Sequence, residues 1–237
     1  MARRDPKPWI GKLSQSKQIS IVERVCRRLQ DRYGLPRHGN PDNSLDDLVY
    51  IIVSNRTRIE TAMEGFDLLK RTVPRWDDVL KDPSQVKRIL QPLGLSNKKT
   101  DQILGILTVL RKDFGLATLE PIRGRSEEWV EKYLTSLPGV SLKVAKCVMM
   151  YTLGFQVLPV DTHVHRIATR LGWVDWKRAD QSHADLEKLV PPTLRYAFHV
   201  DAVAHGQSVC RPLNPHCSIC PITSDCRYAS QKDISVC

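Results

Sequence analysis

Four of the seven cysteines stand close together near the C-terminus, in the pattern Cys210-x6-Cys217-x2-Cys220-x5-Cys226. Four thiolates within 17 residues can surround one compact centre, so this spacing predicts a loop wrapped around a bound group. All-thiolate ligation suits a [4Fe–4S] cluster or a zinc ion. Structural zinc usually takes two close cysteine pairs separated by a dozen or more residues, whereas this pattern has one close pair, so it favours iron–sulfur.

Two other uses of the same cysteines stay open at this point. A zinc-containing structural module is one. A pair of disulfides is the other, although residues 1–10 lack the apolar segment of an export signal, which predicts a reducing compartment. Cys26 and Cys147 lie outside the pattern, on apolar helix faces, and are expected in the core.

Most of the chain repeats apolar residues at intervals of three and four, which predicts helices. No stretch alternates apolar and polar residues convincingly over six positions, so the predicted fold class is all-α. One helix is predicted over 16–33, with Ile19, Val22, Cys26 and Leu29 on one stripe. Further helices are predicted over 44–53 with Ser44 as cap, from Asp82 to before Pro92, and over 97–114, 126–136, 142–153, 162–171, 180–190 and 193–206.

The charge balance points to an anionic partner. Lys and Arg number 36 against 26 Asp and Glu, a formal net charge of +10. Nucleic acid is the default partner for such a chain, with solubility alone as the alternative. The hydrophobic fraction of 41% is ordinary for a globular protein and supports one large domain or two modest ones. No apolar run approaches the ~20 residues that span a bilayer, so no membrane span is predicted.

The segment Leu137-Pro138-Gly139-Val140-Ser141 lies between two helical patterns and predicts a tight turn. The turn leads into a helix N-terminus, whose free N–H groups and positive dipole end suit a phosphate. An ordinary corner between two helices is the alternative.

With the residues that follow it, this turn resembles a known family. The run Leu-Pro-Gly-Val-x-x-Lys at 137–143, followed by Val-Asp-Thr-His at 160–163, is similar to the endonuclease III branch of the helix-hairpin-helix DNA glycosylases. The resemblance implies that Lys143 is the catalytic amine, that Asp161 is the catalytic carboxylate, and that Gly139, Val140 and Ser141 bind DNA. Ser141 stands where the family usually has a second glycine. The hairpin also resembles that of the 8-oxoguanine glycosylases, which usually lack the cysteine cluster.

The cysteine spacing is the same as in the endonuclease III cluster loop, so the resemblance implies a [4Fe–4S] cluster held by Cys210, Cys217, Cys220 and Cys226. Arg211 lies between the first two of these ligands. We expect it to touch the DNA backbone.

The implied chemistry suits an amine and a carboxylate. Breaking the bond between C1′ and the base proceeds through a cation-like transition state, which a carboxylate stabilises. A neutral amine can attack C1′ and leave a Schiff base that permits β-elimination. Lysine normally titrates near ~10.4, so a helix N-terminus and partial burial would have to lower the pKa of Lys143. Lys146 is a competitor for the amine role. Alternatively, Lys143 is a solvated surface lysine and Asp161 caps a helix.

A glycosylase must also turn its target nucleotide out of the stack. The loop Gly94-Leu95-Ser96-Asn97 is similar to the family's wedge loop, which implies that Leu95 fills the gap. Where endonuclease III has Ser-x-Gln, this chain has Ser54-Asn55-Arg56, with Arg56 in place of the glutamine. The run Asn-Arg-Thr at 55–57 resembles the G·T-mismatch thymine glycosylases, which typically lack the catalytic lysine. Asn55 and Arg56 are both expected to contact DNA.

The resemblance implies two helical domains: a six-helix barrel with the hairpin over 42–155, and a cluster domain formed by 1–41 together with 156–237. It implies a monomeric, intracellular glycosylase with β-elimination lyase activity, acting on damaged bases, oxidised pyrimidines above all, or abasic sites in double-stranded DNA. A monofunctional G·T/G·U mismatch glycosylase and a non-catalytic DNA-binding relative are the alternatives.

Overall fold

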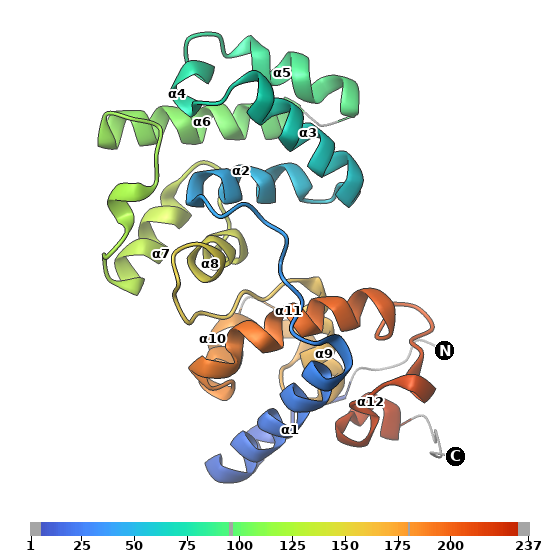
Figure 1. The fold of residues 1–237 in the computed structure, drawn as a ribbon. Coiled ribbons are helices and arrows are strands. Elements are labelled where there is room, and N and C mark those ends of the chain that lie inside the picture. The colour runs from blue at the N-terminus through green and yellow to red at the C-terminus, as the bar shows by residue number, and fades with distance from the viewer. Residues whose placement is uncertain (1–5, 95–96, 180, 232–237) are drawn as a thin grey trace. The chain divides into compact units, whose positions relative to one another are not determined.

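The computed structural model describes residues 6–94, 97–179 and 181–231. Within these ranges the secondary structure consists of α-helices and short 3-10 turns, with no strand, which confirms the all-α prediction (Figure 1). The chain divides into two compact units, one formed by Gly39–Phe155 and the other by Met1–His38 with Gln156–Cys237. No helix in the described ranges has the length and apolarity needed to cross a membrane.

The 39–155 unit carries the hairpin. Its helices are α2 (Ser44–Ser54), α3 (Ile59–Thr72), α4 (Trp76–Val79), α5 (Ser84–Leu90), α6 (Asn97–Phe114), α7 (Glu127–Ser136) and α8 (Leu142–Tyr151), with 3-10 turns η2 (Gln91–Leu93) and η3 (Glu120–Ile122). Helix α2 packs against α3, α6 and α8. It is the most buried helix of this unit, since eight of its eleven residues are buried.

Helix α2 begins differently from the prediction that Ser44 caps it. Asn43 is the cap, because its Oδ1 accepts hydrogen bonds from the backbone N–H groups of Leu45 and Asp46 at 3.0 and 3.1 Å. Ser44 is the first helical residue and is buried. Asparagine and serine are both favoured at N-caps. Ser44 is buried as the first residue of the helix, and Asn43 takes the cap position.

Helix α3 was not predicted, although its buried residues Ala62, Phe66 and Leu69 follow a helical spacing. Its exposed face also carries the apolar residues Ile59, Met63 and Leu68. The difference between an apolar and a polar face is therefore weak in the sequence of this helix. Helix α5 begins after Pro83 at Ser84, one residue later than a first-turn proline would place it.

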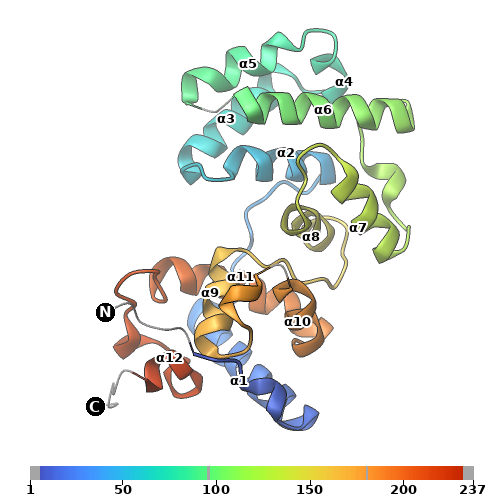
Figure 2. The same cartoon turned by 180° about the vertical axis from the view of Figure 1, so that it is seen from behind.

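The other unit joins the two ends of the chain. Its helices are α1 (Gln15–Tyr33), α9 (Thr162–Leu171), α10 (Ser182–Leu189), α11 (Pro192–Ser208) and α12 (Arg227–Ser230), with 3-10 turns η1 (Ile10–Lys12), η4 (Trp176–Arg178), η5 (Cys217–Ile219) and η6 (Thr223–Asp225) (Figure 2). Helix α1 packs against α11, which itself packs against α9. The shared core includes Val22, Leu29, Ile167 and Phe198.

A tryptophan from the N-terminal segment closes the end of α9. Trp9 donates its indole N–H to the carbonyl of Leu171 at 2.8 Å, and its backbone N–H binds the carbonyl of Gly172 at 3.0 Å. Gly172 has a left-handed φ of 76° and allows no side chain, since a Cβ there would lie 2.5 Å from Trp9 Cδ1. The glycine both ends the helix and admits the indole ring.

Candidate active site and cysteine centre

The predicted hairpin lies between α7 and α8. Gly139 has a left-handed φ of 66°, and the N–H of Val140 closes the turn on the carbonyl of Leu137 at 3.1 Å. A Cβ at Gly139 would lie 2.9 Å from the Gln102 side chain of α6. Glycine is therefore favoured by the backbone conformation, and any larger residue would also have to displace the Gln102 side chain.

Ser141 is the N-cap of α8. Its φ of −79° and ψ of 163° are extended, a conformation open to any residue, so the turn does not depend on the family's second glycine. Its Oγ accepts a long hydrogen bond from the N–H of Val144 at 3.4 Å. The replacement therefore leaves the backbone intact and gives α8 a weak cap of its own.

Two lysines follow on α8, and the structure separates their surroundings. Lys143 lies in the first turn and is half-buried. Lys146 is 5% exposed in its side chain, and its Nζ lies 3.3 Å from Glu131 Oε2. An ion pair with the partly exposed Glu131 holds the buried Lys146, whereas Lys143 is partly exposed to solvent and lies beside the hairpin.

Asp161 is the N-cap of α9, as one of the two interpretations of this residue predicted. Its Oδ1 accepts hydrogen bonds from the N–H groups of His163 and Val164 at 2.9 and 2.8 Å. The cap orients the carboxylate, and the positive end of α9 favours its charge. Lys143 belongs to the 39–155 unit and Asp161 to the other unit.

The segment after α2 contains the predicted DNA probes Asn55 and Arg56. Both are exposed, and Arg56 has a left-handed φ of 54°, a conformation uncommon for residues other than glycine. Lys99 of α6 holds this turn, since its Nζ donates to the carbonyl of Val53 at 2.8 Å and to Thr57 Oγ1. Burial lowers the pKa of Lys99. Leu95, the predicted wedge, lies outside the described residues.

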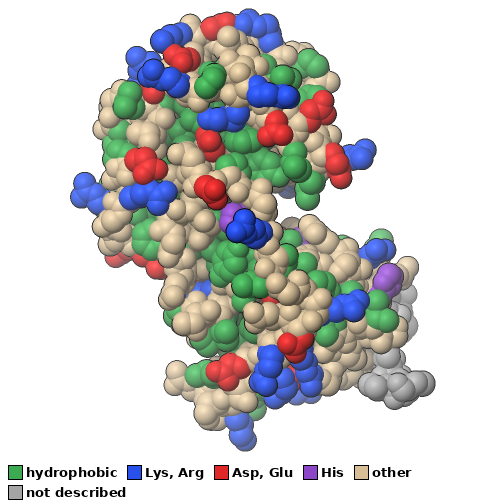
Figure 3. All heavy atoms as spheres, in the orientation of Figure 1, with side chains coloured by type: hydrophobic (Ala, Val, Ile, Leu, Met, Phe, Trp, Pro, Cys, Tyr) green, Lys and Arg blue, Asp and Glu red, His purple; other side chains and the backbone are tan. Residues whose placement is uncertain are grey.

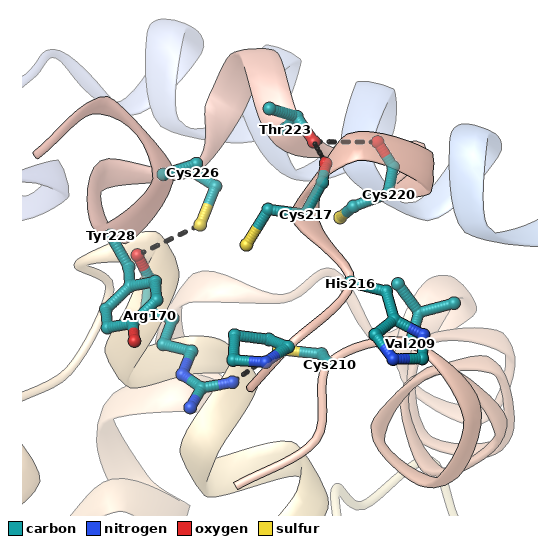
Figure 4. A pocket seen from close by; sticks show the side chains of 11 residues that line it. Arg170, Val209, Cys210, His216, Cys217, Cys220, Thr223, Cys226 and Tyr228 are labelled. Atoms are coloured by element: carbon teal, nitrogen blue, oxygen red, sulfur yellow. Dashed lines mark hydrogen bonds between the residues drawn. The ribbon is translucent and has the colours of Figure 1, made fainter. Parts of the chain in front are cut away.

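The four clustered cysteines line one cavity of the other unit, with about 280 Å³ of empty space, open solvent included. Their thiol groups are directed into it (Figure 4). Burial raises the pKa of Cys226 to about 12 and also raises that of Cys220, so a positively charged group would be needed to hold them as thiolates.

Basic and polar side chains surround these thiols. Arg170 of α9 donates to Cys210 Sγ at 3.2 Å and to the carbonyls of Arg211 and Pro212 at 2.8 and 2.9 Å. His205 of α11 places its Nε2 3.5 Å from Cys220 Sγ. Arg211 itself is exposed, as its predicted contact with DNA requires.

Two ion pairs fasten the cysteine loop to α1. Asp225 accepts from Arg24 at 2.5 Å and from Arg28 at 2.9 Å. These contacts attach the loop to α1, while Ile222 of the loop is buried in the core of the same unit.

The chemistry of the four thiols suits a bound group. All-thiolate ligation suits a [4Fe–4S] cluster or a zinc ion, and the four cysteines line one cavity. Among the described residues, no set of three or more His, Cys, Asp or Glu side chains is placed to hold a single metal ion. Cys26 and Cys147 are buried in the core, which confirms the prediction for both.

Comparison with known proteins identifies the family. Residues 49–192 match the model of the HhH-GPD superfamily base excision DNA repair proteins. The chain belongs to this superfamily. The match confirms the resemblance to endonuclease III on which the helix-hairpin-helix prediction depended.

Curated relatives agree with this assignment. The chain is 37% identical over 169 residues to a putative DNA glycosylase, At3g47830, of Arabidopsis thaliana, and covers 57% of that protein's length with 70% of its own. It is 28% identical over 209 residues to endonuclease III of Thermotoga maritima, covering 88% of this chain and 93% of that protein.

Solved structures share the fold of this HhH-GPD protein. A non-covalent complex of endonuclease III with DNA superposes with a TM-score of 0.77 at 20% identity, covering 93% of this chain and 98% of that one. A thermostable thymine-DNA glycosylase gives a TM-score of 0.72 at 22% identity, over 91% and 98% of the two chains. At such identities the likeness concerns the fold alone.

Sequence reasoning missed Asp47 and Lys99. Asp47 is an acid within the most apolar helical run of the chain, and that contrast is a signal that could have found it. Lys99 carried no such signal, because it follows Lys98 at an ordinary helix start.

Proposed function

We propose that this HhH-GPD protein is a bifunctional DNA glycosylase and abasic-site lyase that acts on damaged bases in double-stranded DNA, oxidised pyrimidines above all. One observation carries the proposal: a half-buried lysine, Lys143, lies in the first turn of α8 directly behind the Pro138–Gly139 turn. The N-capping carboxylate of Asp161 supplies the second group that such chemistry needs.

Each residue has a stated role. The hairpin N–H groups and the N-terminus of α8 bind a backbone phosphate. The carboxylate of Asp161 stabilises the positive charge that develops at C1′ as the bond to the base breaks and the base leaves with the bonding electrons. The neutral amine of Lys143 forms a bond to C1′, which yields a Schiff base. Loss of a C2′ proton then expels the 3′ phosphate.

Binding to DNA also depends on charge spread over both units. On the face shown in Figure 3, Lys and Arg side chains are distributed among acidic ones on each unit. The endonuclease III neighbours were solved bound to DNA, which supports double-stranded DNA as partner here. Arg211, Asn55 and Arg56 are exposed and suited to such contacts. We expect the protein to act as a monomer, inside the cell and associated with DNA.

The cofactor of this proposal is a [4Fe–4S] cluster held by Cys210, Cys217, Cys220 and Cys226. When bound, the cluster supplies four iron–thiolate bonds that stabilise the segment carrying these cysteines. A brown protein with broad visible absorption is the expected result, whereas a colourless protein with one equivalent of zinc would contradict it.

The test is a panel of duplexes carrying thymine glycol, dihydrouracil, uracil, a G·T mismatch, 8-oxoguanine or an abasic site, assayed with and without borohydride. We expect a borohydride-trapped adduct on the oxidised pyrimidines and on the abasic site, and none with Lys143→Gln. A Lys146→Gln variant is the matched control, because Lys146 lies on the same helix but is paired with Glu131.

One observation favours a second candidate, a monofunctional mismatch glycosylase. Arg56 replaces the glutamine that endonuclease III has there, and a thymine-DNA glycosylase shares the fold. Base release from G·T or G·U pairs without a trapped adduct would support this candidate. Binding without base release from any substrate would leave a non-catalytic DNA-binding relative.

A further inference from the structure

The turn that follows α2 holds Arg56 in an uncommon backbone conformation. Its φ of 54° lies in the left-handed region, which is unfavourable for an arginine because the Cβ atom crowds the following carbonyl. Such a conformation persists only where the surrounding structure fixes it, and residues strained in this way gather at functional sites. The side chain of Arg56 is exposed, so its own packing does not account for the conformation.

The last turn of α2 leaves one carbonyl group for a contact outside the helix. In a continued helix the N–H of Thr57 would bind the carbonyl of Val53, but here it binds the carbonyl of Ser54 at 3.1 Å. Lys99 of α6 takes the place of that N–H, since its Nζ donates to the carbonyl of Val53 at 2.8 Å. A cation at the C-terminal end of a helix also suits the helix dipole. Lys99 therefore caps α2.

A second hydrogen bond extends the role of Lys99 beyond that of a cap. The same ammonium group donates to Thr57 Oγ1, and this hydroxyl donates to the carbonyl of Asn55 at 3.3 Å. The Asn55 carbonyl belongs to the peptide group that joins Asn55 to Arg56. The hydrogen-bonded chain from Lys99 through Thr57 therefore ends on the peptide plane whose orientation sets the φ of Arg56.

Two other lysines of the same unit are held differently. Lys70 pairs with Asp46, and Lys146 pairs with Glu131. Lys99 donates instead to a peptide carbonyl and a hydroxyl, which are both neutral. Hydrogen bonds between a cation and a carboxylate are the stronger kind, so a lysine that served stability alone would gain more from an acid. The contacts of Lys99 are better explained by the turn that they shape.

We infer that Lys99 is a positioning residue that, through Thr57, holds Arg56 in the conformation in which it contacts DNA. The inference rests on the proposed function, in which Asn55 and Arg56 contact the duplex. An arginine whose backbone is already fixed loses less conformational freedom on binding than one on a mobile turn. Lys99, Thr57 and Arg56 all belong to the 39–155 unit, so the arrangement of the two units plays no part.

The test is a double-mutant cycle on the affinity for a duplex with one uncleavable abasic-site analogue, measured by fluorescence anisotropy at fixed salt. Lys99→Met removes the donor and nearly keeps the length of the side chain, and Arg56→Ala removes the group that Lys99 would position. We expect each single variant to weaken binding about tenfold, and the double variant to bind no more weakly than Arg56→Ala alone. Lys99→Arg, which keeps a donor, should recover most of the affinity.

Lys98→Met is the matched control, because Lys98 is the exposed neighbour of Lys99 and carries the same charge. Its effect on affinity should be the same in the unchanged protein and in Arg56→Ala, since a general loss of positive charge acts independently of Arg56. Thr57→Val keeps the cap on α2 but breaks the hydrogen-bonded chain. It should therefore reproduce much of the loss of affinity seen with Lys99→Met.

Hydrogen exchange measures the turn directly, without DNA. The N–H groups of Asn55 and Thr57 are hydrogen-bonded to the carbonyls of Ile51 and Ser54 at 3.0 and 3.1 Å. Both should exchange about fivefold faster in Lys99→Met than in Lys98→Met, while the amides of α8 keep their rates, which shows that the unit remains folded.

Effects of Lys99→Met and Arg56→Ala that multiply would overturn the inference, because Lys99 would then act on DNA or on the fold by itself. An unchanged affinity for Arg56→Ala, or unchanged exchange in Lys99→Met, would overturn it as well. Absence of both base release and trapped adduct from the unchanged protein would instead contradict the proposed function. The cycle and the exchange measurement would still test Lys99 in that case, since neither depends on catalysis.

Discussion

The starts of α2 and α9 each contain an aspartate, and the surroundings of the two carboxylates are opposite. Asp161 is the cap of α9 and accepts two backbone hydrogen bonds on one oxygen. Asp47 lies in the first turn of α2, which Asn43 already caps, and one of its oxygens is buried without a hydrogen-bond partner among the described residues. The first acid contributes to helix stability, whereas the second reduces stability.

This difference separates two roles of a carboxylate. Two backbone hydrogen bonds hold the Asp161 carboxylate in place, which suits the fixed electrostatic role that we propose for it. Burial raises the pKa of Asp47 to about 7, so the charged form of this acid destabilises the fold. The following variants test whether stability and activity respond differently at the two sites.

The largest effect is expected for Lys143→Gln, which removes the amine of the proposed site. The borohydride-trapped adduct should disappear, and base release should fall about 10²–10⁴-fold, since the attacking amine is gone. Gel analysis of trapped duplex and single-turnover kinetics measure the two effects. A trapped adduct that persisted would move the amine role to another residue, with Lys146 the first to test.

Asp161→Asn and Asp161→Ala separate charge from capping at α9. Asparagine still caps a helix, so Asp161→Asn should lower base release about 10²–10³-fold and leave the melting temperature nearly unchanged. Asp161→Ala should lose the same activity and about 1 kcal/mol of stability in addition. Equal activity of Asp161→Asn and the unchanged protein would mean that the carboxylate is only a cap.

Asp47→Asn should stabilise the protein, the reverse of the result at Asp161. The pKa of Asp47 is raised from 3.8 to about 7 in the folded state, so its contribution to stability is fully present below pH 4 and is lost as the pH rises through 7. The variant should exceed the unchanged protein by up to about 4 kcal/mol above pH 8, with the difference vanishing towards pH 4. Urea unfolding at several pH values measures this, with Asp46→Asn as control. A difference independent of pH would contradict the assigned burial of charge.

The smallest effects are expected at the start of α8. Ser141→Ala should cost about 0.5 kcal/mol, because the bond from Val144 is long at 3.4 Å. Ser141→Gly frees that N–H for a phosphate and should bind a duplex with an abasic-site analogue about threefold more tightly. Fluorescence anisotropy at fixed salt compares the three proteins. Weaker binding by Ser141→Gly would mean that the serine hydroxyl itself contacts DNA.

Local signals predicted much of the fold. The stripe of Val22, Cys26 and Leu29, the cap at Ser126 and the turn at Gly139 each act within a few residues, and the structure has all three. The cysteine spacing predicted four thiols around one cavity for the same reason. The prediction that Ser44 caps α2 was wrong, because the burial of Ser44 depends on tertiary packing that a local sequence pattern does not contain.

The surroundings of α2 were less accessible to sequence reasoning. The burial of Asp47 depends on the packing of α2 against α3, α6 and α8. The role of Lys99 at the turn after α2 likewise depends on a contact across 46 positions. Spacing rules describe neighbours along one helix, so they could not find either feature.

The unit that holds the cysteines combines residues before 39 with residues after 155, and this affects its folding during synthesis on the ribosome. The apolar stripe of α1 is covered largely by residues after 156. In a nascent chain this stripe therefore stays uncovered while the whole 39–155 unit is synthesised. At ordinary elongation rates, completing α11 after α1 takes about 10 to 35 s. Throughout that interval α1 exposes an apolar surface, and we expect a chaperone to bind the nascent chain there.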